Sequence, residues 1–148
     1  MHIALAADHA GYALKDELAA WLREQGHQVT DLGTNGPESV DYPAFGSKLA
    51  TFVGSGQADR GVAVCGSGIG ISIAVNRDPR CRCARVDDAL SAGLAREHND
   101  ANVLALGARL VGPDMAKACV AAFLGADFAG GRHQRRVDQL SQELQDSD

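Results

Sequence analysis

The sequence predicts an α/β fold with one five-stranded parallel sheet between two layers of helices. Short apolar runs alternate with longer amphipathic segments along the whole chain. Parallel strands need long crossover connections, and helices supply these on both faces of a sheet. The length of 148 residues fits one domain over 1–148, and no linker, internal repeat or low-complexity run divides it. These observations indicate a three-layer, Rossmann-like sandwich.

Five short apolar runs are the predicted strands. Each is bounded by glycine, proline or polar residues that interrupt the run. The strands are Ile3–Ala7, Gln28–Leu32, Gly61–Val64, Arg82–Val86 and Val103–Leu106.

Six helices are predicted between and after these strands. The first covers about 11–25, where apolar residues recur at helical spacing, and the second begins at Pro43 behind Asp41, a candidate cap. The third follows a glycine-rich turn, the fourth covers about 88–97, and the fifth begins at a proline. The last begins near Gly131 and carries Leu144. The C-terminal part of this helix and the tail fill about 138–148, and the polar end is expected to fray.

Charge and cysteine content narrow the class of protein. A net charge of −5 and a pI of about 5.4 argue against binding to nucleic acid or to an anionic membrane. No apolar stretch approaches the ~20 residues that span a bilayer, and no signal peptide is recognisable. The four cysteines have neither a disulfide framework nor metal-binding spacing. We therefore expect a cytoplasmic protein with no metal and no cofactor.

The most informative motif is Cys65-Gly66-Ser67-Gly68-Ile69-Gly70, between a predicted strand and a predicted helix. Its glycines allow a tight turn and leave backbone N–H groups uncovered. These groups and the helix N-terminus favour an anion, and the same N-terminus stabilises the thiolate form of Cys65. The other three cysteines, Cys81, Cys83 and Cys119, follow apolar patterns that favour a packing role.

Ligands of open parallel sheets bind beyond the carboxyl ends of the strands. The first strand ends at Asp8-His9, the third at Cys65, and the fifth just before Arg109. Asp8 alone would be explained as a helix cap, and Tyr42 alone as loop packing. The combination of acid, imidazole, thiol, anion cradle and guanidinium suits proton transfer on a small phosphorylated molecule.

His98-Asn99 occurs where the fourth helix is expected to end. A helix C-cap would explain both residues, because histidine suits the dipole and asparagine tolerates left-handed geometry. A helix-to-strand loop also lies at the sheet edge opposite Cys65. If His98 is catalytic, it therefore acts in the site of a neighbouring subunit.

A basic cluster, Arg132-His133-Gln134-Arg135-Arg136, opens the last helix. Arg132 and Arg136 share one helix face, where positive charge opposes the dipole. A bound phosphate explains this pair better than stability does, whereas Arg135 is assigned to the solvated surface. Arg109 has two open explanations, a phosphate ligand or the partner of a carboxylate.

Five motifs along the chain resemble those of the ribose-5-phosphate isomerase B family, in the group that includes galactose-6-phosphate and allose-6-phosphate isomerases. The resemblance extends from Met1 to about Val137. The motifs are Asp8-His9-Ala10-Gly11, Asp41-Tyr42-Pro43, Cys65 to Gly70, His98-Asn99-Asp100 and Gly130-Gly131-Arg132-His133.

The resemblance implies interconversion of ribose 5-phosphate and ribulose 5-phosphate through a cis-enediolate, without a metal. Cys65 matches the base, and His98 matches the residue that opens the sugar ring. Asp8 would shuttle hydroxyl protons. The Ser67 hydroxyl and turn amides would stabilise the enediolate as an oxyanion hole does. The turn residues implied are Gly66, Gly68, Ile69 and Gly70.

The resemblance also implies the phosphate site and the assembly. Asn99 and Tyr42 would line the site, which lies at a subunit interface in this dimeric or tetrameric family. We therefore expect a homo-oligomer with shared sites and a sugar phosphate as its small-molecule partner. The phosphate ligands implied are His9, Arg109, Arg132 and Arg136.

Two positions refine the match to the family, and three other functions are considered. Some relatives have threonine in place of Ser67, and another branch uses a glutamate aligned with Ile71, so this chain belongs with the cysteine type. One alternative is a 6-phosphohexose isomerase acting on allose or galactose 6-phosphate. Another is a nucleotide-binding module, since Asp87 follows the glycine turn by about 20 residues. The third is a sugar-phosphate sensor without turnover.

Overall fold

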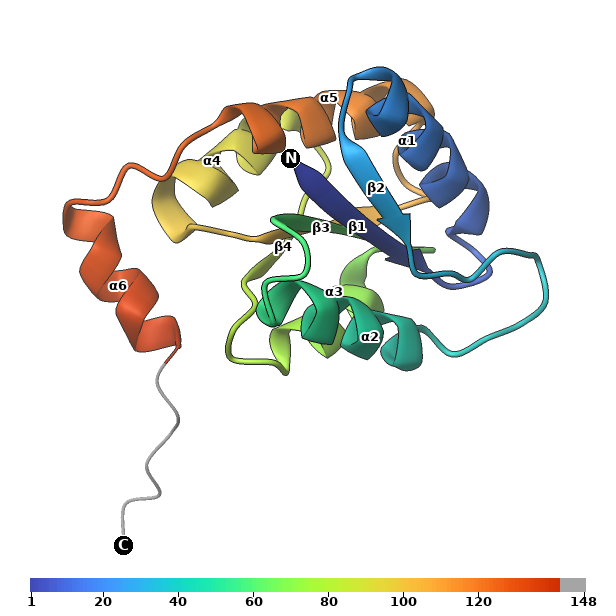
Figure 1. Ribbon diagram of the computed structural model, residues 1–148, viewed down its shortest axis with the longest axis horizontal. Helices are drawn as coiled ribbons and strands as arrows, with labels where there is room; N and C mark the ends of the chain where they lie inside the picture. The colour runs from blue at the N-terminus through green and yellow to red at the C-terminus, as the bar shows by residue number, and fades with distance from the viewer. Residues whose placement is uncertain (142–148) are drawn as a thin grey trace, which may run out of the picture.

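The computed structural model describes residues 1–141 as a parallel five-stranded sheet with helices on both faces (Figure 1). The strand order is β2-β1-β3-β5-β4. The strands are β1 (His2–Ala7), β2 (Gln28–Asp31), β3 (Arg60–Cys65), β4 (Cys83–Arg85) and β5 (Val103–Gly107). The helices are α1 (Tyr12–Glu24), α2 (Tyr42–Gly54), α3 (Ile69–Asn76), α4 (Ala89–Asn99), α5 (Pro113–Gly125) and α6 (Arg132–Leu140).

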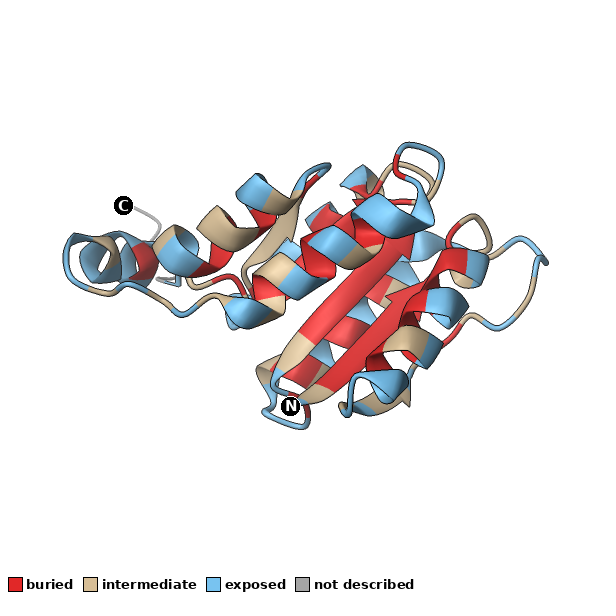
Figure 2. Cartoon of the chain, turned by 90° about the horizontal axis from the view of Figure 1, so that it is seen from above, coloured by how far each residue is buried: buried red, intermediate tan, exposed pale blue. Residues whose placement is uncertain are grey.

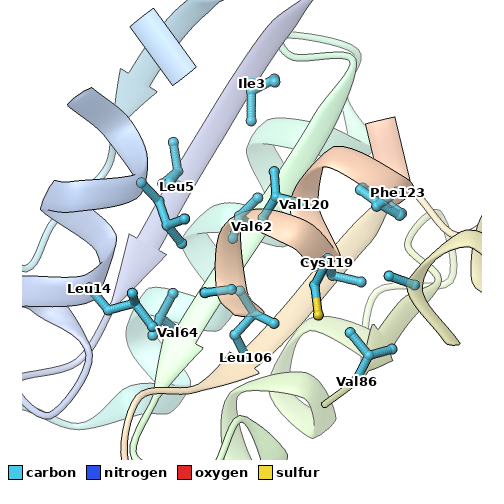
Figure 3. Close-up of a cluster of buried hydrophobic side chains, with 14 of the residues drawn as sticks. Ile3, Leu5, Leu14, Val62, Val64, Val86, Leu106, Cys119, Val120 and Phe123 are labelled. Carbon is cyan, nitrogen blue, oxygen red and sulfur yellow. The ribbon is translucent and has the colours of Figure 1, made fainter. Parts of the chain in front are cut away.

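Two apolar clusters, one on each face of the sheet, form the core. Successive residues of β3 alternate between them, with Val62 and Val64 on one face and Ala63 and Cys65 on the other. Leucines of α1 and residues of α4 and α5 join the first cluster (Figure 3), and α2 and α3 cover the second. Figure 2 shows the central strands buried along most of their length. The predicted three-layer α/β fold is confirmed.

The five predicted strands and six predicted helices are all present, and most ends agree within one or two residues. The end of α4 lies two residues beyond the expected one. The helix continues through Asn99, and Asp100 takes the left-handed geometry at φ 47°. Asp100 is held there by Arg96 at 2.9 Å and by Arg82 at 3.3 Å. Asp41 precedes α2 as expected, but its side chain makes no capping hydrogen bond.

The structure tests the expected start of the last helix but not the expected C-terminal tail. The last helix begins at Arg132, as expected. Leu144 and the tail expected to fray lie outside the described residues. Within residues 1–141, no helix combines the length and apolar character needed to cross a bilayer.

The turns that follow β3 and β5 lie backbone against backbone. A Cβ atom on Gly68 would stand 2.8 Å from the carbonyl carbon of Leu106, and one on Gly107 would stand 2.7 Å from that of Ser67. Gly68 also has a φ of 75°, which disfavours any side chain. The Ala108 N–H donates to the Cys65 carbonyl at 2.9 Å. These contacts fix the carboxyl end of β3 against that of β5.

A buried ion pair holds the connection between β2 and α2. Lys15 of α1 has no exposed surface, and its Nζ lies 2.6 Å from an oxygen of Asp31 and 2.7 Å from one of Asp16. Nζ also donates to the side chain of Asn35 at 3.3 Å. The segment that leads to Tyr42 is therefore tied to α1 at the end of β2.

We expect Gly107→Ala to lower the free energy of unfolding by about 1–3 kcal/mol, the usual effect of overpacking, because its Cβ meets the backbone of Ser67. Gly93→Ala is the matched control, since its Cβ meets nothing within 4 Å and it lies inside α4. The control is expected to raise stability by roughly 0.5–1 kcal/mol. Urea unfolding measures both, and equal stabilities for the two variants would contradict the tight contact.

Candidate active site

A cavity of about 270 Å³ opens at the carboxyl edge of the sheet. It collects residues from the end of β1, the start of α2, and the turns after β3 and β5. A larger cavity of about 420 Å³ lies between α2 and the end of α3, but it contains none of the predicted site residues. The residues of the sheet-edge cavity are Asp8, Tyr42, Cys65, Gly66, Ser67, Gly70, Arg109 and Leu110.

Cys65 lies at the end of β3 and is 4% exposed. Its Sγ accepts a hydrogen bond from the Gly68 N–H at 3.1 Å. Burial raises the pKa of Cys81 to about 11 and also raises the pKa values of Cys83 and Cys119. Of the four cysteines, only Cys65 shares this cavity with an acid and a guanidinium.

The glycine-rich turn is partly occupied by its own hydrogen bonds. The Gly68 N–H faces the sulfur of Cys65, and the Ile69 N–H donates to the Ser67 hydroxyl oxygen at 3.2 Å. This differs from the expectation of uniformly uncovered amides. The Ser67 hydroxyl accepts from Ile69 and keeps its own proton available for donation.

Asp8 lines the cavity and also orders the turn before α1. It is 6% exposed, and its Oδ1 accepts the N–H groups of Ala10 and Gly11 at 3.0 and 3.1 Å. The carboxylate therefore orders the turn that leads into α1, and it also lines the cavity. Asp8 is nevertheless not the cap of α1, because the N-cap residue is Gly11 and no side chain caps this helix.

Tyr42 and Arg109 lie against glycines of the turn. A Cβ on Gly70 would stand 2.5 Å from the Tyr42 ring, and one on Gly66 would stand 3.1 Å from the Arg109 guanidinium. Tyr42 thus contacts the start of α3 and is more than loop packing. No acidic side chain of residues 1–141 forms an ion pair with Arg109. This removes the carboxylate-partner explanation for the described part of the chain.

His9 lies beside Asp8 but outside the cavity lining. Its Nδ1 lies 3.1 Å from the backbone nitrogen of Val40 and 3.2 Å from the carbonyl oxygen of the same residue. This contact joins the end of β1 to the segment before Tyr42. It fixes the ring of His9 beside the cavity.

The remaining predicted residues lie elsewhere in the same chain. His98 ends α4, and its ring stacks on His133 with centroids 4.4 Å apart and planes at 14°. Desolvation and the nearby His98, Arg132 and Arg136 lower the pKa of His133. Figure 1 shows α6 on the opposite side of the molecule from the arrowheads of β1 and β2.

The structure therefore divides the predicted site into two parts. The Ala129 N–H donates to the Glu97 carbonyl at 2.9 Å, which ties the segment before α6 to the end of α4. Asn99 lines a different cavity, of about 390 Å³, together with Leu140 of α6. The opposite placement of His98 and Cys65 agrees with the topological expectation for a helix-to-strand loop.

Sequence reasoning missed the roles of two residues. His133 was included in the basic cluster without a role, although its place in the Gly130-Gly131-Arg132-His133 motif was a usable signal. Arg85 was not singled out at all. Its Nε donates to the Ser67 carbonyl at 3.0 Å, a contact between segments that the sequence pattern does not connect.

A family model described as Ribose/Galactose Isomerase matches residues 3–140. Ribose-5-phosphate isomerase B of Escherichia coli (strain K12) is 47% identical over 139 residues, which are 94% of this chain and 93% of that protein.

Two solved structures share the fold over nearly all of both chains. Ribose-5-phosphate isomerase B of Clostridium thermocellum has a TM-score of 0.94 and 51% identity, with 95% of each chain covered. The enzyme of that name from Mycoplasma genitalium, with bound ribulose-5-phosphate, has a TM-score of 0.91 and 38% identity, covering 95% of this chain and 93% of that one. With a family match over almost all of its residues and relatives this similar, the chain belongs to the ribose/galactose isomerase family.

Proposed function

We propose that this protein interconverts ribose 5-phosphate and ribulose 5-phosphate by moving a proton between C1 and C2 of the sugar. The observation that carries the proposal is the position of Cys65, with its sulfur at the floor of a cavity between Asp8, Arg109 and the glycine-rich turn. The curated relative from Escherichia coli is named for this reaction, and the structure from Mycoplasma genitalium contains the ketose product.

The proposed chemistry uses a thiolate base and hydrogen-bond donors fixed in the turn. The Cys65 thiolate takes the proton from C2 of the open-chain aldose, and the resulting thiol returns it to C1. Negative charge on the enediolate oxygens is stabilised by turn amides and by the Ser67 hydroxyl. Asp8 relays a proton between the two oxygens, so the protein ends each cycle in its starting protonation state.

The phosphate would bind to Arg109, which lines the cavity, and to His9, which follows Asp8 in the chain. Arg132, Arg136, His98 and Asn99 are held at the other edge of the sheet, so in this proposal a second copy of the chain supplies them. His98 of that copy acts on the furanose ring as its acid and base. The site is then shared between subunits of a homo-oligomer.

Exposed apolar side chains around the cavity support this assembly. Ile69, Ile73 and Leu110 are 51, 60 and 59% exposed, and Tyr42 beside them is 41% exposed. Ile69 and Ile73 are four residues apart on α3, so they share one face of that helix. Apolar surface that flanks a polar cavity is typical of an interaction site.

The direct test is a turnover assay with ribose 5-phosphate, allose 6-phosphate and galactose 6-phosphate. We expect the pentose phosphate to have the highest kcat/KM. A higher kcat/KM for a hexose phosphate would change the proposed substrate but not the proposed mechanism. Binding without turnover of any of the three would contradict the enzyme and support the sensor alternative.

Cys65→Ala is expected to lower kcat by roughly 10²–10⁴-fold, the usual contribution of a general base, while KM stays close to the original value. Steady-state kinetics with ribose 5-phosphate measure this. Cys119→Ala is the control, because Cys119 is fully buried on the opposite face of the sheet and should affect stability alone. Alkylation should inactivate the original protein, and substrate should protect it. A normal kcat in Cys65→Ala would refute the assignment.

Arg132→Ala and Arg136→Ala are each expected to raise KM for ribose 5-phosphate on the order of tenfold or more, since each removes a charged hydrogen bond to phosphate. Arg135→Ala is the matched control from the same exposed helix. Weak affinity for unphosphorylated ribose should be unaffected in all three. Equal losses with all three variants would indicate a general surface effect.

The shared site predicts complementation between inactive variants. The Cys65→Ala homodimer and the His98→Ala homodimer are each expected to have little isomerase activity. After unfolding and refolding together, a mixed dimer contains one site with both defects and one site with neither, so activity should return. Mass spectrometry establishes that mixed dimers form. Mixed dimers without recovered activity would place both residues in one subunit's site and contradict the model.

A further inference from the structure

We propose that Arg85 is a positioning residue for Cys65, which it influences through the single peptide group between Ser67 and Gly68. This inference rests on the proposed role of Cys65 as the base. Arg85 ends β4, and β4 is separated from β3 by β5. Its side chain reaches the glycine-rich turn at the carbonyl oxygen of Ser67 and does not line the cavity.

Two hydrogen bonds connect the arginine to the sulfur. The Arg85 Nε donates to the carbonyl oxygen of Ser67 at 3.0 Å. The N–H of the same peptide unit belongs to Gly68, and it donates to the Sγ of Cys65 at 3.1 Å. In a planar trans peptide the C=O and N–H groups point in opposite directions, so the guanidinium and the sulfur lie at its two ends.

The first consequence concerns orientation. Gly68 adopts a φ of 75° and has no side chain of its own to hold the Ser67–Gly68 peptide in one orientation, so this orientation depends on contacts with other segments. A rotated peptide would present its carbonyl oxygen to the sulfur and would repel a thiolate. The bond from Arg85 to the carbonyl oxygen selects the orientation in which the N–H faces Cys65.

The second consequence concerns charge. A cation bonded to a carbonyl oxygen polarises the peptide and strengthens its N–H as a donor. The side chain of Arg85 is 26% exposed, and Asp87 fixes its Nη1 at 2.6 Å. The polarised N–H donates to Cys65, so it stabilises the thiolate more than the thiol. Arg85 thus favours the form of Cys65 that removes the proton.

Other charged and titratable groups also face Cys65 and must remain unchanged in any test. Asp8 of the β1 end, Tyr42 of α2 and Arg109 of the turn after β5 line the same cavity. Arg85 differs from all three because it lies outside the cavity lining. Its loss should therefore change the chemical step more than substrate binding.

A second arginine of the chain provides a matched control. Arg80 pairs with Asp78 at 2.7 Å, with the same two-residue separation as Arg85 and Asp87. The hydrogen bonds recorded for the Arg80 guanidinium go to Asp78, and none goes to the glycine-rich turn. Arg80→Met therefore removes a comparable surface ion pair without touching Ser67.

The experiment measures alkylation of Cys65 by iodoacetamide, located by mass spectrometry, from mildly acidic to alkaline buffer. We expect Arg85→Met to slow this reaction at neutral pH by roughly threefold to tenfold, a fraction of what a full charged hydrogen bond contributes. The difference should shrink in alkaline buffer, where ionisation no longer limits the reaction. Arg85→Lys, which keeps the charge, should recover part of the rate.

The kinetic counterpart is a fall in kcat for ribose 5-phosphate by a similar factor, with KM unchanged. Unchanged alkylation in Arg85→Met overturns the proposal, and so does an equal effect of Arg80→Met. A raised KM with constant kcat would assign Arg85 to binding and overturn it as well. Circular dichroism checks the folding of each variant, and Arg85→Lys stands in if Arg85→Met fails to fold.

The alkylation measurement does not depend on turnover. If the original protein isomerises no sugar phosphate, the proposed function fails. The comparison of Arg85→Met with Arg80→Met still decides whether Arg85 acts on the sulfur. The two failures are therefore distinguishable.

Discussion

The close approach of two backbone turns is the constraint on which the rest of the structure depends. Gly68 and Gly107 leave no room for a Cβ between the ends of β3 and β5, and these two strands are neighbours in the sheet. Any side chain at either position would push Cys65 away from the turn that carries Arg109. The site is therefore built mainly by sheet register and backbone contact, and its side chains are added to a fixed frame.

The same frame sets the surroundings of the Cys65 sulfur, the proposed base. Hydrogen bonds within the turn hold the Gly68 and Ile69 N–H groups in defined directions. These bonds hold the Cys65 sulfur and the Ser67 hydroxyl in place before substrate arrives, so little reorganisation is needed in the proposed reaction. The ion pair of Lys15 and Asp31 extends the same principle to the segment before Tyr42.

The fold could be predicted because its signals are local. Apolar runs marked all five strands, and topology alone placed His98 away from Cys65. Long-range contacts were not readable. The end of α4 depends on Arg82 and Arg96, which meet at Asp100 from different elements. The contact of Arg85 with Ser67 depends on the order of three strands, so nothing in its sequence neighbourhood indicated it.

Helix α6 has few contacts with the rest of its own chain, so its folding is linked to association with a second chain. This helix has nine residues, and Val137 is the one that it buries. Isolated helices of this length are marginally stable in water, and arginines in the first turn oppose the dipole further. Contact with a second chain and a bound anion would remove both disadvantages. In the proposed assembly, dilution to the monomer would unfold α6 before it unfolded the sheet. Catalytic activity would then be lost below a protein concentration at which the sheet is still folded.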